Sequence, residues 1–120
     1  MPRFNKFEEI DVWQKARGHC QKIYQTTARS NFGKDRSLSE QIQKAVVSIS
    51  SNIAEGFERN SRKEFIRFLL FAKGSAGEVR SQLYLARDLG YLSTEEFEEL
   101  YEENLEICKM ISGLITYLRE

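Results

Sequence analysis

The residues of this chain with the greatest capacity for chemistry are polar side chains that recur at helical spacing beside apolar ones. At about 100° per residue, one segment brings Ser48, Asn52 and Glu55 onto a narrow polar stripe next to an apolar face. Carboxylates near a guanidinium and hydroxyl groups could bind a small ligand or transfer protons, and they could equally bond to one another between two helices. We interpret the set as a structural polar seam that fixes helix register. Its members are Ser48, Asn52, Glu55, Arg67, Gly74, Ser75 and Glu78.

The densest basic cluster in the sequence is Arg59, Arg62 and Lys63. In a bundle of antiparallel helices, this corner lies at the same end as the N-terminal Arg3 and Lys6. Several cations at one end, repeated by cyclic symmetry, could hold a phosphate backbone even on a neutral chain. Acidic neighbours would neutralise much of this charge, so we interpret the corner as solvated surface and keep nucleic-acid contact as a hypothesis.

The residue types that hold metals or act as nucleophiles are sparse. A dinuclear metal site in a helical bundle needs Glu-x-x-His on two helices, whereas His19 is the one histidine, and we expect it at the surface or the core boundary. Cys20 and Cys108 match no zinc spacing, and we expect two reduced, buried thiols in a reducing compartment. Gly74 and Gly77 fall inside a helix rather than after a strand, which argues against a phosphate-binding loop. We therefore predict no catalytic residue, metal, cofactor or small-molecule substrate.

The composition is that of a globular domain. The chain has 120 residues, enough for one core, and we predict a single domain over 1–120. Apolar residues make up 41% and charged residues 30%, which argues against both a disordered chain and a membrane protein. Lys plus Arg and Asp plus Glu both total 18, so net charge gives no reason to expect nucleic acid or an anionic membrane. The N-terminus lacks the apolar core of a signal peptide, which predicts a cytoplasmic protein.

Apolar residues recur at the helical period almost throughout the chain, and no proline follows Pro2. We expect Asp11 to cap the first helix and Gly90 to end the third in a left-handed turn. Because the connections are short, the fold is predicted to be all-α, an antiparallel up-down-up-down four-helix bundle. The predicted helices cover about 11–28, 38–59, 62–89 and 94–119. Capping boxes are predicted at Ser37 to Glu40, Ser61 to Glu64 and Ser93 to Glu96.

The third predicted helix is apolar on two faces near its start, where the sequence reads Phe-Ile-Arg-Phe-Leu-Leu-Phe-Ala. A helix in an isolated bundle exposes one face to water, so a second apolar face indicates a partner beyond the monomer. Glycine is a poor helix former, and we expect Gly56, Gly74 and Gly77 to allow close backbone approach. Asn104 lies within the apolar stripe of the last helix, where an amide specifies register. The predicted interface between subunits contains Ile66, Leu70, Phe71, Leu85 and Leu89.

Several motifs in a fixed order carry a family resemblance. They are Val12-Trp13-Gln14-Lys15-Ala16, Asn52-Ile53-Ala54-Glu55-Gly56, Ala72-Lys73-Gly74-Ser75 with Glu78, and Leu89-Gly90-Tyr91-Leu92. Their combination resembles the four-helix-bundle proteins encoded in intervening sequences of bacterial 23S ribosomal RNA genes. The resemblance spans nearly the whole chain and implies a bundle that assembles as a ring, typically of five subunits. The chain is also distantly similar to the accessory variability proteins of diversity-generating retroelements, which are pentameric bundles that hold RNA and a reverse transcriptase.

The residues and the resemblance lead to one hypothesis and one alternative. The hypothesis is a non-enzymatic homo-oligomeric scaffold or adaptor, a pentameric ring, that binds RNA or a nucleic-acid-handling protein. The alternative is a small-ligand sensor or enzyme that uses Glu55, Glu78 and Arg67 around a polar pocket.

Overall fold

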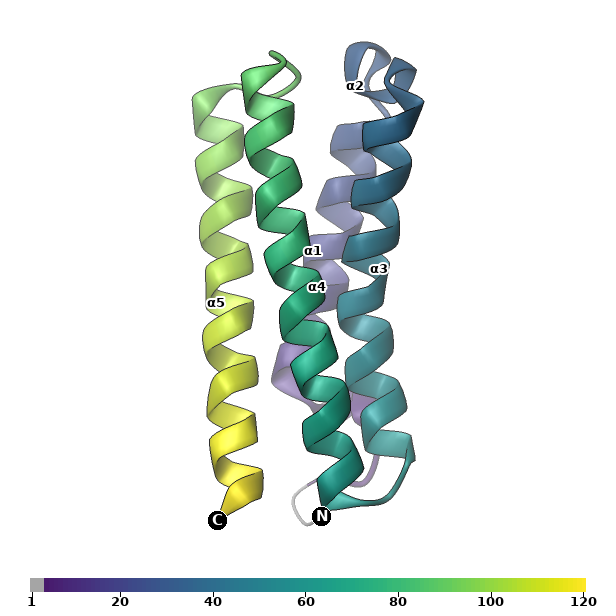
Figure 1. The fold of residues 1–120 in the computed structure, drawn as a ribbon, viewed down its shortest axis with the longest axis vertical. Helices are drawn as coiled ribbons and strands as arrows, with labels where there is room; N and C mark the ends of the chain where they lie inside the picture. The colour runs from purple at the N-terminus through teal and green to yellow at the C-terminus, as the bar shows by residue number, and fades with distance from the viewer. Residues whose placement is uncertain (1–3) are drawn as a thin grey trace.

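The computed structural model describes residues 4–120, except for the side chain of Ser30, and consists of helices joined by short connections. Figure 1 shows that each long helix runs in the opposite direction to the long helix before it. Each long helix packs against two others, in the cyclic order α1, α3, α4, α5 and back to α1. The prediction of an all-α bundle is therefore confirmed. The long helices are α1 (Asp11–Thr27), α3 (Arg36–Glu58), α4 (Arg62–Asp88) and α5 (Thr94–Arg119); the short ones are η1 (Phe7–Glu9) and α2 (Ser30–Lys34).

The helix ends confirm some of the capping predictions and contradict others. Ser93 and Glu96 form the complete reciprocal capping box at the start of α5. Ser61 caps α4 by accepting from the backbone N–H of Glu64, whereas the carboxylate of Glu64 bonds to Arg67 instead of reaching back. The backbone of Gly90 has φ +81°, so the predicted left-handed end of α4 is confirmed.

The predicted capping residues of α3 and α1 are wrong, although α3 begins within two residues of the predicted position. The short helix α2 fills the expected loop, and Asp35 then caps α3 by accepting from the backbone N–H of Leu38 at 3.1 Å. Ser37 therefore lies inside α3 rather than at its cap. Asp11 is the first residue within α1, and Ile10 occupies the cap position without a side-chain hydrogen bond.

A second role of Asp35 ties together the two connections at this end of the bundle. The Tyr91 hydroxyl donates to Asp35 Oδ2 at 2.9 Å, and the Tyr91 ring stacks on Phe32 with 5.2 Å between centroids. This hydrogen bond raises the pKa of Tyr91, because ionised Tyr91 would face a carboxylate. The connection between α4 and α5 is thereby held against α2 and the start of α3.

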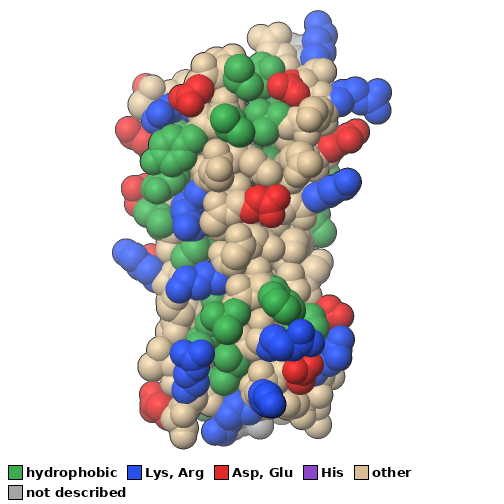
Figure 2. Space-filling view, viewed as in Figure 1, with side chains coloured by type: hydrophobic (Ala, Val, Ile, Leu, Met, Phe, Trp, Pro, Cys, Tyr) green, Lys and Arg blue, Asp and Glu red, His purple; other side chains and the backbone are tan. Residues whose placement is uncertain are grey.

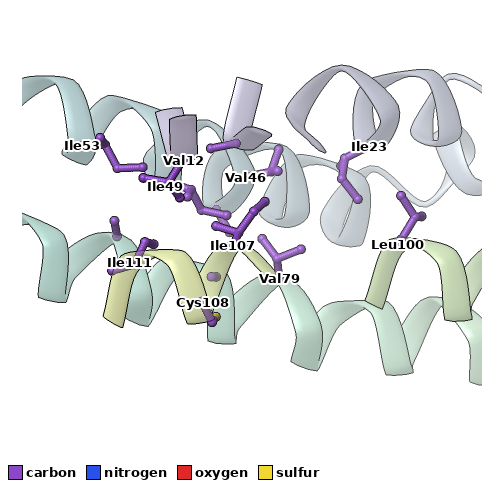
Figure 3. Close-up of a cluster of buried hydrophobic side chains, with 14 of the residues drawn as sticks. Val12, Ile23, Val46, Ile49, Ile53, Val79, Leu100, Ile107, Cys108 and Ile111 are labelled. Atoms are coloured by element: carbon purple, nitrogen blue, oxygen red, sulfur yellow. The ribbon is translucent and has the colours of Figure 1, made fainter. Parts of the chain in front are cut away.

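The core receives side chains from all four long helices, and Figure 3 shows those from α1 and α3 meeting those from α4 and α5. Its centre is aliphatic, and each fully buried Ile or Leu side chain contributes about 1.5–3 kcal/mol relative to exposure. Phe4 and Phe7 pack against this core from the N-terminal arm. No helix within residues 4–120 is long and apolar enough to cross a membrane.

Only one of the three glycines singled out in the sequence is required by packing within the chain. A Cβ atom on Gly56 would lie 2.6 Å from the Cβ of Phe68, so this glycine allows α3 and α4 to approach closely. A Cβ on Gly74 would meet nothing within 4 Å, and one on Gly77 would meet only the side chain of Arg80 at 3.7 Å. Within the chain, the expectation of close approach holds for Gly56 and fails for Gly74 and Gly77.

Candidate functional site

The centre of the predicted polar seam lies between α3 and α4. The hydroxyl oxygens of Ser48 and Ser75 are 2.9 Å apart, which bridges the two helices. Asn52 donates from Nδ2 to the Ser48 carbonyl at 2.8 Å and to Ser48 Oγ at 2.9 Å. These groups satisfy one another and fix the register of α3 against α4, with Ser48 facing Ser75.

The charged residues assigned to the seam lie on the surface and do not converge. Glu55 is exposed and pairs with Arg59 along its own helix, at 3.5 Å. Arg67 is exposed and donates two hydrogen bonds to the carboxylate of Glu64, at 3.1 and 3.2 Å. Glu78 is exposed and lies about 16 Å along α4 from Arg67, at 1.5 Å per residue. The structure does not bring Glu55, Glu78 and Arg67 around one pocket.

The basic corner lies where α3 ends and α4 begins. Arg59 pairs with Glu55 and with Glu64, and its guanidinium lies over the ring of Phe68 at 4.9 Å from the centroid. Arg62 and Lys63 are exposed in the first turn of α4. Phe4 and Asn5 line a groove with Phe57, Glu58 and Asn60, so the N-terminal arm lies at the same corner. Arg3 lies outside the described residues.

The outer face of α4 exposes large apolar side chains. Leu70, Phe71, Leu85 and Leu89 are each 46–58% exposed, and Ile66 is half-buried against the core. Figure 2 shows apolar side chains gathered towards both ends of this side of the molecule, with a mostly polar band between them. The predicted interface residues therefore form two patches, at the two ends of α4, and Gly74, Ser75 and Glu78 lie between them. We call this surface the α4 face.

The upper patch of the α4 face borders a groove between α3 and α4. Leu85 and Leu89 line this groove of about 330 Å³ together with Leu38 and Gln82. Gln82 is buried, and no donor within the described residues reaches its Oε1 atom. Most buried polar atoms in proteins have a hydrogen-bond partner, so an unpaired amide oxygen beside exposed leucines is unusual.

A second polar network lies inside the bundle, and the prediction for His19 was wrong. His19 is 0% exposed rather than at the surface or core boundary. Its Nδ1 atom is 2.8 Å from Glu103 Oε1, and its Nε2 atom is 3.1 Å from Asn104 Nδ2. Asn104 Oδ1 accepts from Arg80 at 2.8 Å, so the amide must present its NH₂ group to His19. His19 therefore accepts from Asn104 at Nε2 and donates from Nδ1 to Glu103.

This internal network joins α1, α4 and α5. Lys22 donates to Glu103 at 2.9 Å, and Arg80 also approaches Cys108 Sγ at 2.8 Å. Burial raises the pKa of Glu103, but hydrogen bonds from His19 and Lys22 outweigh it and hold the pKa at about 2. Among the described residues, no buried side-chain nitrogen or oxygen of this network lacks a partner, and the network holds three helices together. Asn104 contacts both neighbouring helices from the register position predicted for it.

The acidic run of α5 is partly neutralised by α1. Arg29 pairs with Glu96, and Lys22 pairs with Glu103 and, at 3.8 Å, with Glu99. The bond from Arg29 and the capping bond to Ser93 lower the pKa of Glu96 to about 2. Within residues 4–120, no three His, Cys, Asp or Glu side chains lie close enough together to hold a metal ion.

Comparison with known proteins agrees with the motifs. The family model of the 23S rRNA-intervening sequence protein matches residues 8–113. No curated protein matches the chain. A similar solved structure is a protein of unknown function from the S23 ribosomal protein family of Bacteroides thetaiotaomicron VPI-5482. It is 29% identical, with a TM-score of 0.79, and the alignment covers 87% of this chain and 97% of that one. The chain belongs to the family of 23S rRNA-intervening sequence proteins.

Proposed function

We propose that this chain is a non-enzymatic cytoplasmic scaffold that assembles with copies of itself into a ring, and that one end of the ring binds RNA. The observation that carries the proposal is the α4 face, where Leu70, Phe71, Leu85 and Leu89 are about half exposed along one helix. Two exposed apolar patches on one helix of a small domain mark an interaction site. A second copy of the same chain is the simplest partner, because copies of the chain are always present together where it is expressed.

The size of the chain is compatible with two contacts per subunit. The surface of the isolated subunit is 6790 Å². A stable interface buries about 800 Å² on each partner, so the two contacts of a ring would use roughly a quarter of this surface. Five is the subunit number that the family resemblance implies, and a ring of five would have a mass of about 70 kDa, from 14.0 kDa per chain.

The RNA part of the proposal rests on the corner formed by Arg59, Arg62 and Lys63. Arg62 and Lys63 are exposed and project from the first turn of α4, at one end of the bundle. Cyclic symmetry would repeat these cations around one end of the ring, and such a ring of charge attracts a phosphate backbone. Arg59 is partly neutralised by Glu55 and Glu64, so we expect Arg62 and Lys63 to make the larger contribution.

The assembly is tested by light scattering behind size-exclusion chromatography. Phe71 and Leu85 are exposed in the isolated subunit and would be buried in the interface. Phe71→Glu and Leu85→Glu would each bury a carboxylate there, so both should shift the ring toward monomer. Thr116→Glu, an exposed change on α5, is the matched control and should leave the mass unchanged. If both α4 variants keep the mass of the unmodified protein, the α4 face is not the interface. Circular dichroism confirms that each variant is folded.

RNA binding is tested by titrating a labelled single-stranded RNA at several salt concentrations. Reversing Arg59, Arg62 and Lys63 to Glu should abolish binding, and the slope of log K against log salt for the unmodified protein should reflect about 0.7 per phosphate contact. Lys34→Glu with Arg36→Glu, at the opposite end of the bundle, is the control. Equal RNA binding by the corner variant and the control would show that this corner is not the RNA-binding site. If the ring binds no RNA, the RNA part of the proposal is wrong and a protein is the partner to look for.

A further inference from the structure

The ring of the proposed function needs two different faces on every subunit, and the second face can be identified. In a cyclic ring larger than a dimer, each contact joins one surface of a subunit to a different surface of the next. The α4 face supplies one surface. Among the residues that the structure describes, three further large apolar side chains are substantially exposed: Tyr24, Val47 and Tyr84. Tyr84 lies on α4 itself, beside Leu85, so Tyr24 and Val47 are the two that lie on another side of the bundle.

Tyr24 and Val47 form a ridge on the side of the bundle made by α1 and α3. Their side chains are 44% and 39% exposed and stand beside a shallow groove that Lys44, Gln43 and Glu40 also line. Glu40 pairs with Arg36 at 3.9 Å. Within residues 4–120, neither the Tyr24 hydroxyl nor the Lys44 ammonium group has a hydrogen-bond or ion-pair partner. We call Tyr24, Lys44 and Val47 the ridge.

The middle of the α4 face offers open space at a glycine and a carboxylate of the charge opposite to Lys44. Gly74 is exposed, and a Cβ added to it would meet nothing within 4 Å, so packing within the chain gives no reason for a glycine. Phe71 and Leu85 flank it on the same face, about one and three turns away. Glu78, one turn from Gly74, is exposed, and its one contact in the described chain is a 3.4 Å hydrogen bond from Gln82. We call this stretch, from Phe71 to Leu85, the saddle.

The ridge and the saddle lie at the same height along the bundle. Ser48 of α3 faces Ser75 of α4, so in this antiparallel pair Lys44 lies level with Val79. Gln43 of α3 donates to Thr27 of α1 at 2.9 Å, which places Tyr24 level with Val46. Val46 in turn lies level with Gly77. Tyr24 is therefore at the height of the glycines of the saddle, and Lys44 is about one residue, or about 1.5 Å, above Glu78.

We propose that the ridge of one subunit packs into the saddle of the next, with Lys44 paired to Glu78 of the partner subunit. Both surfaces run along the sides of the bundle, so a ring with its axis along the bundle brings them together at equal height. Tyr24 and Val47 would lie over the surface left free by Gly74, between the apolar side chains on either side. The unpaired cation of the ridge would then meet the carboxylate of the saddle, which has no ion pair within the described chain.

The test is a charge reversal and its restoration in one chain. Lys44→Glu places two carboxylates in contact and Glu78→Lys places two cations in contact. Each should raise the concentration for half-assembly by on the order of tenfold or more. The double variant Lys44→Glu with Glu78→Lys should restore assembly to within about threefold of the unmodified protein. Lys109→Glu and Glu102→Lys, exposed on α5, are the matched controls and should change nothing.

The outcomes separate this inference from the proposed function. Assembly is measured by sedimentation velocity over a dilution series, with circular dichroism to confirm folding. If the unmodified protein is monomeric, the ring itself is refuted. If it forms a ring and the double variant assembles no better than the single variants, the ring stands and the pairing of ridge with saddle is overturned. If Glu78→Lys weakens assembly and Lys44→Glu does not, the ridge lies outside the contact and the pairing is likewise overturned.

Discussion

Three glycines inside long helices provide a comparison in which the same substitution to alanine should give opposite results. Gly56, Gly74 and Gly113 lie in α3, α4 and α5, and replacing glycine by alanine in a helix interior stabilises it by about 0.8–1 kcal/mol. A Cβ on Gly74 or Gly113 would meet nothing within 4 Å, so Gly74→Ala and Gly113→Ala should each stabilise the dissociated subunit by about that amount.

Gly56→Ala should have the opposite effect. The added methyl group would lie 2.6 Å from the Cβ of Phe68 and 3.1 Å from a ring carbon of Phe65, and Cβ atoms can move only if the helices move apart. Overpacking of this kind costs about 1–3 kcal/mol, and the close contact with Phe68 places it at the upper end. After subtraction of the helix-propensity gain, the fold should lose about 2 kcal/mol.

A larger side chain separates Gly74 from Gly113. Gly74→Leu should weaken assembly by roughly ten- to hundredfold, because it overpacks the contact with the partner subunit by about 1–3 kcal/mol. Gly113→Leu, also in open space on α5, should leave assembly unchanged. Urea unfolding of dilute protein measures the subunit, and sedimentation velocity measures the assembly. Equal assembly of the two leucine variants would refute the assignment of Gly74 to an interface, and a neutral Gly56→Ala would refute the packing account of α3 against α4.

Three further changes test the polar networks. The pKa of Glu103 lies at about 2 in the folded chain and near 4.5 as its ordinary value, so its contribution is present above pH 4.5 and lost as the pH falls toward 2. Between pH 5 and 2.5, urea unfolding should show unmodified protein losing roughly 2 kcal/mol more than Glu103→Gln; equal losses would contradict the sign. Asn104→Leu removes the partner of His19 Nε2 and the amide oxygen that accepts from Arg80, and it should cost about 2–4 kcal/mol in the same assay, whereas a neutral result would mean that these two bonds contribute nothing. Tyr91→Phe should cost about 1 kcal/mol, and the loss should vanish in an Asp35→Ala background if the bond between these side chains is its cause.

The number, length and ends of the long helices could be predicted because they depend on local signals. The 3.6-residue apolar period and the Ser93 capping box depend on residues within one turn of one another. The residue that caps α3 could not be predicted in the same way. Ser37 and Asp35 are both good capping residues. Asp35 takes the role with one carboxylate oxygen, and its other oxygen accepts from Tyr91, which is 56 residues away in the sequence.

The internal network shows a similar limit. His19 lies three residues after the buried Ala16 and four before the buried Ile23, a spacing that places it on the core face. That signal was present in the sequence. The partners that make a buried imidazole tolerable, Glu103 and Asn104, come from α5, more than 80 residues away. Periodicity identifies a buried position, but it does not reveal which distant side chains satisfy a polar group there.

In the candidate site too, some features could be predicted from helical spacing and others could not. The α4 face and the contact between Ser48 and Ser75 follow from helical spacing, and the structure places both on α4 or at its contact with α3. Glu55, Arg67 and Glu78 also share a side of the bundle on a helical wheel, yet the structure gives the first two nearer partners on their own helices. A wheel shows the direction of a side chain and not its position along the axis, so it cannot separate convergent groups from dispersed ones.

The mass of the unmodified protein in solution tests the central claim most directly. Light scattering behind size-exclusion chromatography, with absorbance read at 260 and 280 nm, should give about 70 kDa for a ring of five subunits of 14.0 kDa. Bound RNA would raise the absorbance at 260 nm across the same peak, and reversing Arg59, Arg62 and Lys63 should remove it. A single species near 14.0 kDa at micromolar concentration would contradict the account, because the α4 face would then be exposed without a second copy to cover it.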